Sequence, residues 1–216
     1  MKSFFEKPLH ILSIASLFCI VLVLGRCALF GGLHYLFLGW NLFLAWLPVF
    51  FILCLRASEK RGDHWLLRLL LFGGWMAFLP NSPYILTDLF HLRAKLEPLW
   101  LNWLILLSFG WTGLLLGLWS LRQARGWVHA KFGANAARFF VPLMIVACAY
   151  GVYLGRFERW NSWDLLTDPL GIAGDMLASL GSPRAIGMTV LFSLFLAFAW
   201  WSFGPLFQKE QDEHET

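Results

Sequence analysis

Long apolar runs separated by short polar stretches dominate the pattern of this chain. Six of these runs come close to the length of about 20 apolar residues that a helix needs to cross a bilayer. They cover roughly residues 9–29, 35–55, 65–79, 99–121, 136–154 and 185–207. The pattern therefore predicts an all-α fold, an integral membrane helical bundle of about six transmembrane helices that forms a single domain over residues 1–208.

The composition supports a membrane environment. Of the 216 residues, 59% are hydrophobic and only 14% are charged, and the mean hydropathy is +0.64. Soluble domains are about 45–50% apolar and about 25% charged. The formal net charge is +4, but the Lys and Arg residues flank the apolar runs, where they set membrane topology. The sequence therefore favours a protein that contacts membrane lipid and excludes a nucleic-acid-binding protein.

The distribution of Lys and Arg predicts the orientation. With the N-terminus inside, eleven Lys and Arg residues lie on the inner side and six on the outer side. Since positive residues favour the cytoplasmic side, both termini are expected in the cytoplasm. The polar and mostly acidic residues 209–216 are then expected to form a disordered cytoplasmic tail.

The third run stops early, at Pro80. Its 15 residues would form a helix of about 22 Å, whereas the hydrocarbon layer is about 30 Å thick. Pro80 and Pro83 break the helix, and Asn81 and Ser82 can satisfy the backbone groups that the prolines leave without partners. Because irregular backbone at membrane depth must be buried or line a wet cavity, a polar pocket is expected in the outer leaflet.

Polar side chains cluster just after this break, at Asn81, Tyr84, Thr87, Asp88 and His91. Thr87 is expected to cap a restarting helix. Asp88 and His91 are three residues apart, so they share one helix face and are candidates for a divalent metal site or for acid–base catalysis. The alternative is structural, with Asp88 near a helix start for electrostatic reasons and His91 at the level of the headgroups.

A second polar stretch follows the fifth run and contains Arg156, Arg159, Asn161 and Asp164. Two arginines beside a membrane can hold a phosphate or carboxylate with paired hydrogen bonds. The structural alternative is a network of ion pairs, for example Arg156 with Asp88 or Arg159 with Asp164. Both interpretations stay open on the sequence alone.

The rest of the outer loop, residues 156–184, combines apolar positions with acidic ones. This pattern is typical of a helix that lies on the membrane surface, with interruptions at Pro169 and Gly171. We therefore expect short interfacial helices there.

Gly113 and Gly117 are four residues apart in the fourth run. Pairs of small residues at this spacing let two membrane helices approach closely. This pair suggests a homodimer formed through the fourth helix.

The two polar stretches resemble a bacterial membrane family known only as domain of unknown function 1361. The first match consists of Phe78, Pro80, Asn81, Ser82, Pro83, Tyr84, Thr87, Asp88, His91 and Leu92. The second consists of Gly155, Arg156, Phe157, Arg159, Asn161, Ser162, Trp163 and Asp164. The resemblance covers about residues 26–207 and implies a multi-pass protein of the bacterial inner membrane. It implies no activity, substrate or cofactor.

These observations lead to one favoured function and one alternative. The favoured function is a polar site at the outer leaflet, where the two stretches meet, that binds a lipid headgroup, a lipid-linked substrate or a divalent metal. The alternative is a non-enzymatic accessory or scaffold subunit, and catalysis is left open. The candidate residues are Asn81, Tyr84, Asp88, His91, Arg156, Arg159, Asn161 and Asp164.

Overall fold

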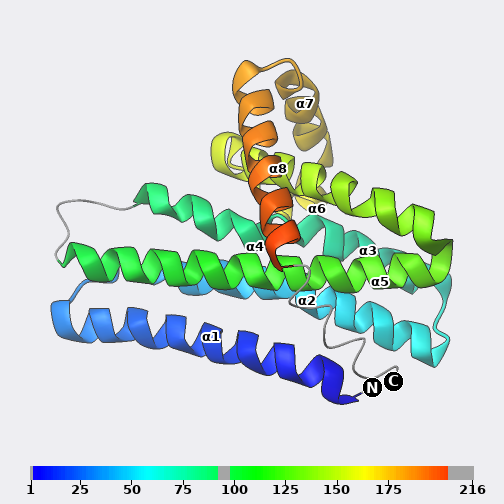
Figure 1. Cartoon of the computed structure of the whole chain (residues 1–216). Coiled ribbons are helices and arrows are strands. Elements are labelled where there is room, and N and C mark those ends of the chain that lie inside the picture. Colours follow the sequence, from blue (N-terminus) through cyan, green and yellow to red (C-terminus); the bar gives the residue numbers. More distant parts are fainter. Residues whose placement is uncertain (1, 92–97, 204–216) are drawn as a thin grey trace. The chain divides into compact units, whose positions relative to one another are not determined.

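The computed structural model describes residues 2–91 and 98–203, without the side chains of residues 2–6, 90 and 91, and these residues form helices and no strands (Figure 1). The prediction of an all-α fold is thereby confirmed. The elements are α1 (Lys2–Phe30), α2 (Phe37–Arg61), α3 (Trp65–Phe78), α4 (Asn81–Tyr84), the 3-10 helix η1 (Ile85–His91), α5 (Leu99–Tyr153), the π-helical turn η2 (Leu154–Glu158), α6 (Asp164–Thr167), α7 (Pro169–Ser179) and α8 (Pro183–Phe203). The tail at residues 209–216 lies outside the described residues.

Five of the described helical segments are long and apolar enough to cross a membrane. One of them covers 60 residues, Leu99–Glu158, and contains both the fourth and the fifth predicted run. At 1.5 Å per residue it would measure about 90 Å, three times the hydrocarbon thickness. Gly133 interrupts it with a φ of 86° and a ψ of 176°, which only glycine adopts easily. The long segment therefore consists of two helices joined at Gly133.

The connection between these two helices differs from the sequence prediction. The fourth apolar run ends at Leu121, and we expected the helix to end with it, but the helix continues from Leu121 up to the kink at Gly133. Two properties explain the extension. Leu121, Gln123 and Ala124 are buried, and the stretch is rich in residues with high helix propensity.

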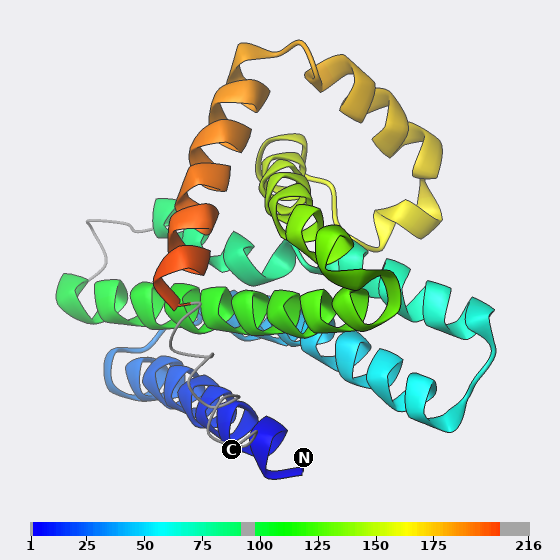
Figure 2. The ribbon, with the colours of Figure 1, turned by 45° about the vertical axis from the view of Figure 1, so that its right-hand side comes forward.

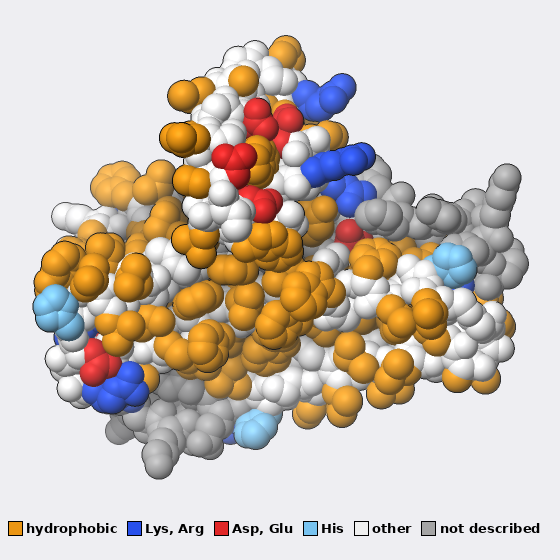
Figure 3. Space-filling view, turned by 180° about the vertical axis from the view of Figure 1, so that it is seen from behind, with side chains coloured by type: hydrophobic (Ala, Val, Ile, Leu, Met, Phe, Trp, Pro, Cys, Tyr) orange, Lys and Arg blue, Asp and Glu red, His pale blue; other side chains and the backbone are white. Residues whose placement is uncertain are grey.

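Large apolar side chains remain on the surface along the spans. Leu29 is 77% exposed, Phe139 73% and Trp201 73%. Orange apolar side chains spread over the visible face in the space-filling view, while charged side chains form small groups (Figure 3). A soluble monomer rarely exposes so much apolar surface, so lipid is the environment that fits it. The chain is an integral membrane protein.

The chain forms two compact units. Unit 2 comprises Lys7–Trp127, and unit 1 comprises Val128–Thr216 with the first six residues. A single domain over residues 1–208 stays a prediction.

In unit 2, α1, α2, α3 and the first part of α5 run side by side (Figures 1 and 2). The glycines of α5 let α4 and η1 approach closely. A methyl group at Gly113 would overlap the carbonyl oxygen of Ser82, and one at Gly117 would lie 2.9 Å from the Ser82 Cβ. The glycine face is thus covered within the unit by the proline-containing segment. The homodimer stays a prediction, but these glycines have an intramolecular role.

In unit 1, the last part of α5 passes between α7 and α8 (Figure 2). The hydroxyl of Tyr150 donates to the carbonyl oxygen of Met176 at 2.9 Å and lies 2.7 Å from the Ser179 hydroxyl. On the other side, Tyr153 and Leu154 pack with Ala185 of α8. The predicted short helices of the outer loop are present as α6 and α7. The break between them lies at Asp168, next to Pro169, but the interruption predicted at Gly171 is wrong because Gly171 lies inside α7.

Candidate functional site

The proline break at the end of α3 is a change of helix type. The α-helix stops at Phe78, as predicted, and the chain continues through α4 into η1 with right-handed helical dihedrals at Leu79 and Pro80. The side-chain amide of Asn81 donates to the Phe78 carbonyl oxygen at 3.2 Å. The hydroxyl of Ser82 donates to Ala45 of α2 at 3.1 Å. Asn81 therefore satisfies a backbone oxygen beside the break, as predicted, whereas Ser82 bonds to the neighbouring helix α2 instead.

Thr87 of η1 is arranged differently from the expectation. Thr87 was expected to cap a helix by accepting from a backbone N–H, but its hydroxyl donates to the Tyr84 carbonyl oxygen at 2.7 Å. The cap is not needed because α4 and η1 follow α3 almost without interruption, so no new helix begins at Thr87. Tyr84 itself is partly buried.

Asp88, the acidic residue of the first motif, is buried, with 1% of its surface exposed. Its Oδ2 accepts a hydrogen bond of 2.7 Å from the side-chain amide of Asn41, on α2. Asn41 lies within the second apolar run, so this hydrogen bond joins two elements that are distant in sequence. A carboxylate in such surroundings needs hydrogen bonds, because an uncompensated charge there is costly.

A buried arginine lies in the same unit. Arg26 of α1 is 3% exposed. Its Nε donates to Oδ1 of Asn102 at 2.7 Å, and its Nη1 donates to the Gly31 carbonyl oxygen at 3.2 Å. Its guanidinium carbon lies 5.0 Å from the centre of the Tyr35 ring. A guanidinium has five N–H donors, and among the described residues the rest of them have no hydrogen-bond partner.

The sequence analysis did not single out Arg26 as a candidate residue. A signal was present, because Arg26 lies inside the first apolar run, where a charged residue is expensive and a candidate for function. Asn102 likewise lies in the fourth apolar run, and it is fully buried.

The two polar pairs lie at the same end of unit 2. Arg26 is near the end of α1, while Asn41 and Asn102 are near the starts of α2 and α5. Asp88 follows α3 and α4, which run antiparallel to α5, as the contacts from Ser82 to Gly117 and from Leu86 to Gly110 show. We call Arg26, Asn41, Asp88 and Asn102 the buried polar cluster. It brings one positive and one negative side chain to one end of an apolar bundle.

The second motif lies in unit 1 and forms a compact turn. After η2, Arg159 adopts a left-handed conformation with a φ of 64°. Asp164 Oδ2 accepts from the Asn161 backbone N–H at 2.7 Å and from its side-chain amide at 3.1 Å. Asp164 and Asn161 thus bond to each other, and this local pairing takes the place of the ion pair expected between Arg159 and Asp164.

The other carboxylates of this region also accept from neutral donors. Glu158 accepts from the Tyr153 hydroxyl at 2.6 Å, Asp175 from the Trp160 indole at 2.8 Å, and Asp168 from the Gly171 N–H at 2.9 Å. Arg159 is exposed and forms no ion pair within the part of the chain that the structure describes. Arg156 is partly buried.

The structure brings some of the predicted site residues together and leaves others untested. Asn81, Tyr84 and Asp88 lie in unit 2, whereas Arg156, Arg159, Asn161 and Asp164 lie in unit 1, so the predicted meeting of the two motifs stays a prediction. The side chain of His91 lies outside the described residues, and so does its predicted pairing with Asp88. Among the side chains that are described, no group of three or more His, Cys, Asp and Glu residues is placed to hold a metal ion.

Comparison with known proteins gives one match. The family model described as "Protein of unknown function (DUF1361)" matches residues 40–199. No curated protein and no solved structure matches the chain. The match includes both polar motifs together with Asn41 and Asn102, and it begins after Arg26.

Proposed function

The chain belongs to the DUF1361 family, whose description gives no activity, and from its geometry we propose that it binds an anionic headgroup of a lipid or lipid-linked substrate at the buried polar cluster. The observation that carries this proposal is the Arg26 guanidinium. It is held in an apolar bundle by Asn102, Gly31 and the Tyr35 ring, with further N–H donors left for a ligand. Phosphate and carboxylate groups match the geometry of such donors.

Asp88 supplies the complementary half of the site. Its carboxylate can accept from hydroxyl or ammonium groups of the same headgroup, and Asn41 orients it through the 2.7 Å hydrogen bond. A site with both charges suits a headgroup that carries an anionic group beside a donor group. From the bias of Lys and Arg, we place this end at the outer leaflet of a bacterial inner membrane.

Two parts of the candidate site have other roles in this proposal. Arg156 and Arg159 of the second motif can hold anionic headgroups at the membrane surface, while Asn161 and Asp164 shape the turn that presents them. A divalent metal would need Asp88 and His91 together with further ligands, so we rank it below the anionic headgroup.

A scaffold role is the second candidate, and one observation favours it. Each polar pair of the cluster joins two elements that are distant in sequence, Asn41 with Asp88 and Arg26 with Asn102. Bonds of this kind hold helices together in membranes. A scaffold would use them for stability alone, so ligand binding separates the two functions.

The test is mass spectrometry of lipids bound to the purified protein. Arg26→Lys keeps the positive charge but loses the planar fork of donors, so the bound anionic species should be lost. The matched control is Arg138→Lys, the same change at an exposed arginine of α5 that has no part in the proposed site, and it should keep that species. Unfolding in detergent is measured in parallel, and Asp88→Asn replaces Arg26→Lys if the latter does not fold. A folded Arg26→Lys or Asp88→Asn variant that keeps the same bound lipids as the wild type would overturn the proposal in favour of the scaffold.

A further inference from the structure

The opposite end of unit 2 carries an excess of positive charge. At this end α2 stops at Arg61, α3 starts at Trp65 and α5 passes residues 122–125. Nineteen residues of helix, about 28 Å, separate Lys60 from Asn41 of the buried polar cluster. We call this region the basic end. It contains six basic side chains and two acidic ones, Arg56, Lys60, Arg61, Arg68, Arg122 and Arg125 with Glu59 and Asp63.

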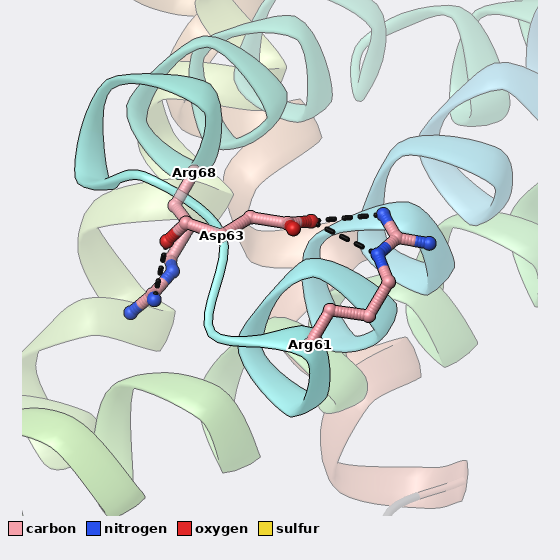
Figure 4. Close-up of polar contacts among 3 residues, drawn as sticks. All are labelled: Arg61, Asp63 and Arg68. Atoms are coloured by element: carbon pink, nitrogen blue, oxygen red, sulfur yellow. Dashed lines mark hydrogen bonds and ion pairs between the residues drawn. The ribbon is translucent and has the colours of Figure 1, made fainter.

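The two carboxylates of the basic end already have basic partners. Asp63 Oδ2 accepts from Nη2 and Nε of Arg61 at 2.9 and 3.0 Å, and its backbone oxygen accepts from Arg68 (Figure 4). The hydrogen bond from Arg61 lowers the pKa of Asp63, so this carboxylate is charged at neutral pH. Glu59 accepts from Arg68 at 3.3 Å and from the Trp127 indole at 2.7 Å.

Among the residues that the structure describes at this end, basic side chains outnumber acidic ones by four. Arg56 and Lys60 are four residues apart on α2, and Arg122 and Arg125 are three apart on α5, so each pair shares a helix face. Arg56 joins the two helices, because its Nη2 donates to the Gln123 carbonyl oxygen at 3.2 Å. Besides Glu59 and Asp63, the only acidic residue of unit 2 that the structure describes is Asp88, at the other end. Like charges gathered in this way attract anions.

Arg68 gives a second, independent sign of a missing acceptor. Its Nη1 and Nη2 have partners, but its Nε is buried and has no hydrogen-bond partner within the described part of the chain. A buried guanidinium N–H without an acceptor is costly. The orphaned donor and the excess charge belong to the same end of the unit.

We infer that the basic end binds the phosphate group of an anionic phospholipid, with Lys60 and Arg125 as its exposed ligands and Arg56, Arg68 and Arg122 beside them. Apolar side chains next to it explain why the ligand is a lipid. At the start of α3, Trp65 is 64% exposed, Leu66 47% and Leu69 56%, so acyl chains can pack there. Basic sites at the ends of membrane helices bind such headgroups. The inference concerns the end opposite to the buried polar cluster and does not depend on the function proposed there.

The experiment titrates the delipidated full-length protein with phosphatidylglycerol and, separately, with phosphatidylcholine, and follows binding by native mass spectrometry. We expect phosphatidylglycerol to bind more tightly, and Arg125→Gln to weaken its binding by about fivefold, the effect of one basic residue near a headgroup. Arg61→Gln is the matched control, since it removes the same charge from the same end but from a guanidinium that Asp63 occupies. Its binding should stay close to that of the wild type.

Three results would overturn the inference. Equal losses in Arg125→Gln and Arg61→Gln would show a general charge effect without a site. Equal binding of the two lipids would remove the role of the anionic headgroup. Inorganic phosphate that binds on its own and displaces the lipid would identify a soluble ligand. If Arg125→Gln does not fold, Lys60→Gln takes its place with the same expected loss.

Discussion

In the first motif Asp88 bonds to Asn41 across 47 residues of sequence, whereas in the second motif Asp164 bonds to Asn161 only three residues away. The first pair lies inside a bundle, with Asp88 1% exposed, and it joins two elements. The second pair is at the surface and closes one turn. Both pairs join a carboxylate to an amide, so a difference in their effect on stability comes from their position and not from their chemistry. Position decides whether the pair stabilises the fold of a unit or only a loop.

The largest effect is expected from removing the amide of each pair. Asn41→Leu leaves the buried Asp88 carboxylate without this donor and should lower the free energy of unfolding by about 3 kcal/mol. Asn161→Leu is the matched change in the second motif and should cost less than about 1 kcal/mol, because water can replace the lost donor. Unfolding by denaturing detergent measures both. Similar losses in the two variants would contradict the contrast between the motifs.

A smaller effect on the free energy of unfolding is expected from replacing one glycine in each unit with alanine. Gly113→Ala should destabilise by about 2 kcal/mol, because the added Cβ meets the backbone of Ser82 and the helices must separate. In unit 1 the added Cβ of Gly174→Ala meets nothing within 4 Å, so the higher helix propensity of alanine should stabilise by up to about 1 kcal/mol. The same unfolding assay applies. Opposite signs are the expected outcome, and a neutral Gly113→Ala would refute the close approach.

The smallest effect is expected from the acid of the second motif. Asp164→Ala removes three acceptor contacts, two to Asn161 and one of 3.4 Å to Thr167, all of them near the surface. Exposed interactions contribute little, so the cost should be below about 1 kcal/mol. Proteolysis of the loop should nevertheless become faster, because the turn is less ordered. Unfolding of the whole protein at much lower detergent concentration would show that this turn matters beyond its loop.

The membrane architecture could be predicted because it depends on run length and composition alone. The end of α3 before Pro80 and the helices of the outer loop followed from proline and apolar periodicity. The extension of α5 up to Gly133 was missed, since the arginines near Leu121 suggested a loop, while burial of Gln123 and Ala124 kept the helix intact.

The partners within the candidate site could not be predicted in the same way. The sequence pointed to Asp88 together with His91, three residues on, because local spacing is all that a sequence displays, and that pairing stays a prediction. The observed partner, Asn41, and the pairing of Arg26 with Asn102 depend on which helices pack together. Interhelical register comes from close contacts between elements, such as the approach of Gly113 to the backbone of Ser82, and no local pattern encodes it.

The most direct test of the account exchanges the two members of the buried pair. Asn41→Asp combined with Asp88→Asn keeps one carboxylate and one amide but places the carboxylate on α2. We predict that the double variant regains the unfolding free energy of the wild type to within about 1 kcal/mol, while the anionic species seen by lipid mass spectrometry stays lost. Recovery of both the stability and the bound lipid would contradict the account, because the pair would then act only by joining two helices.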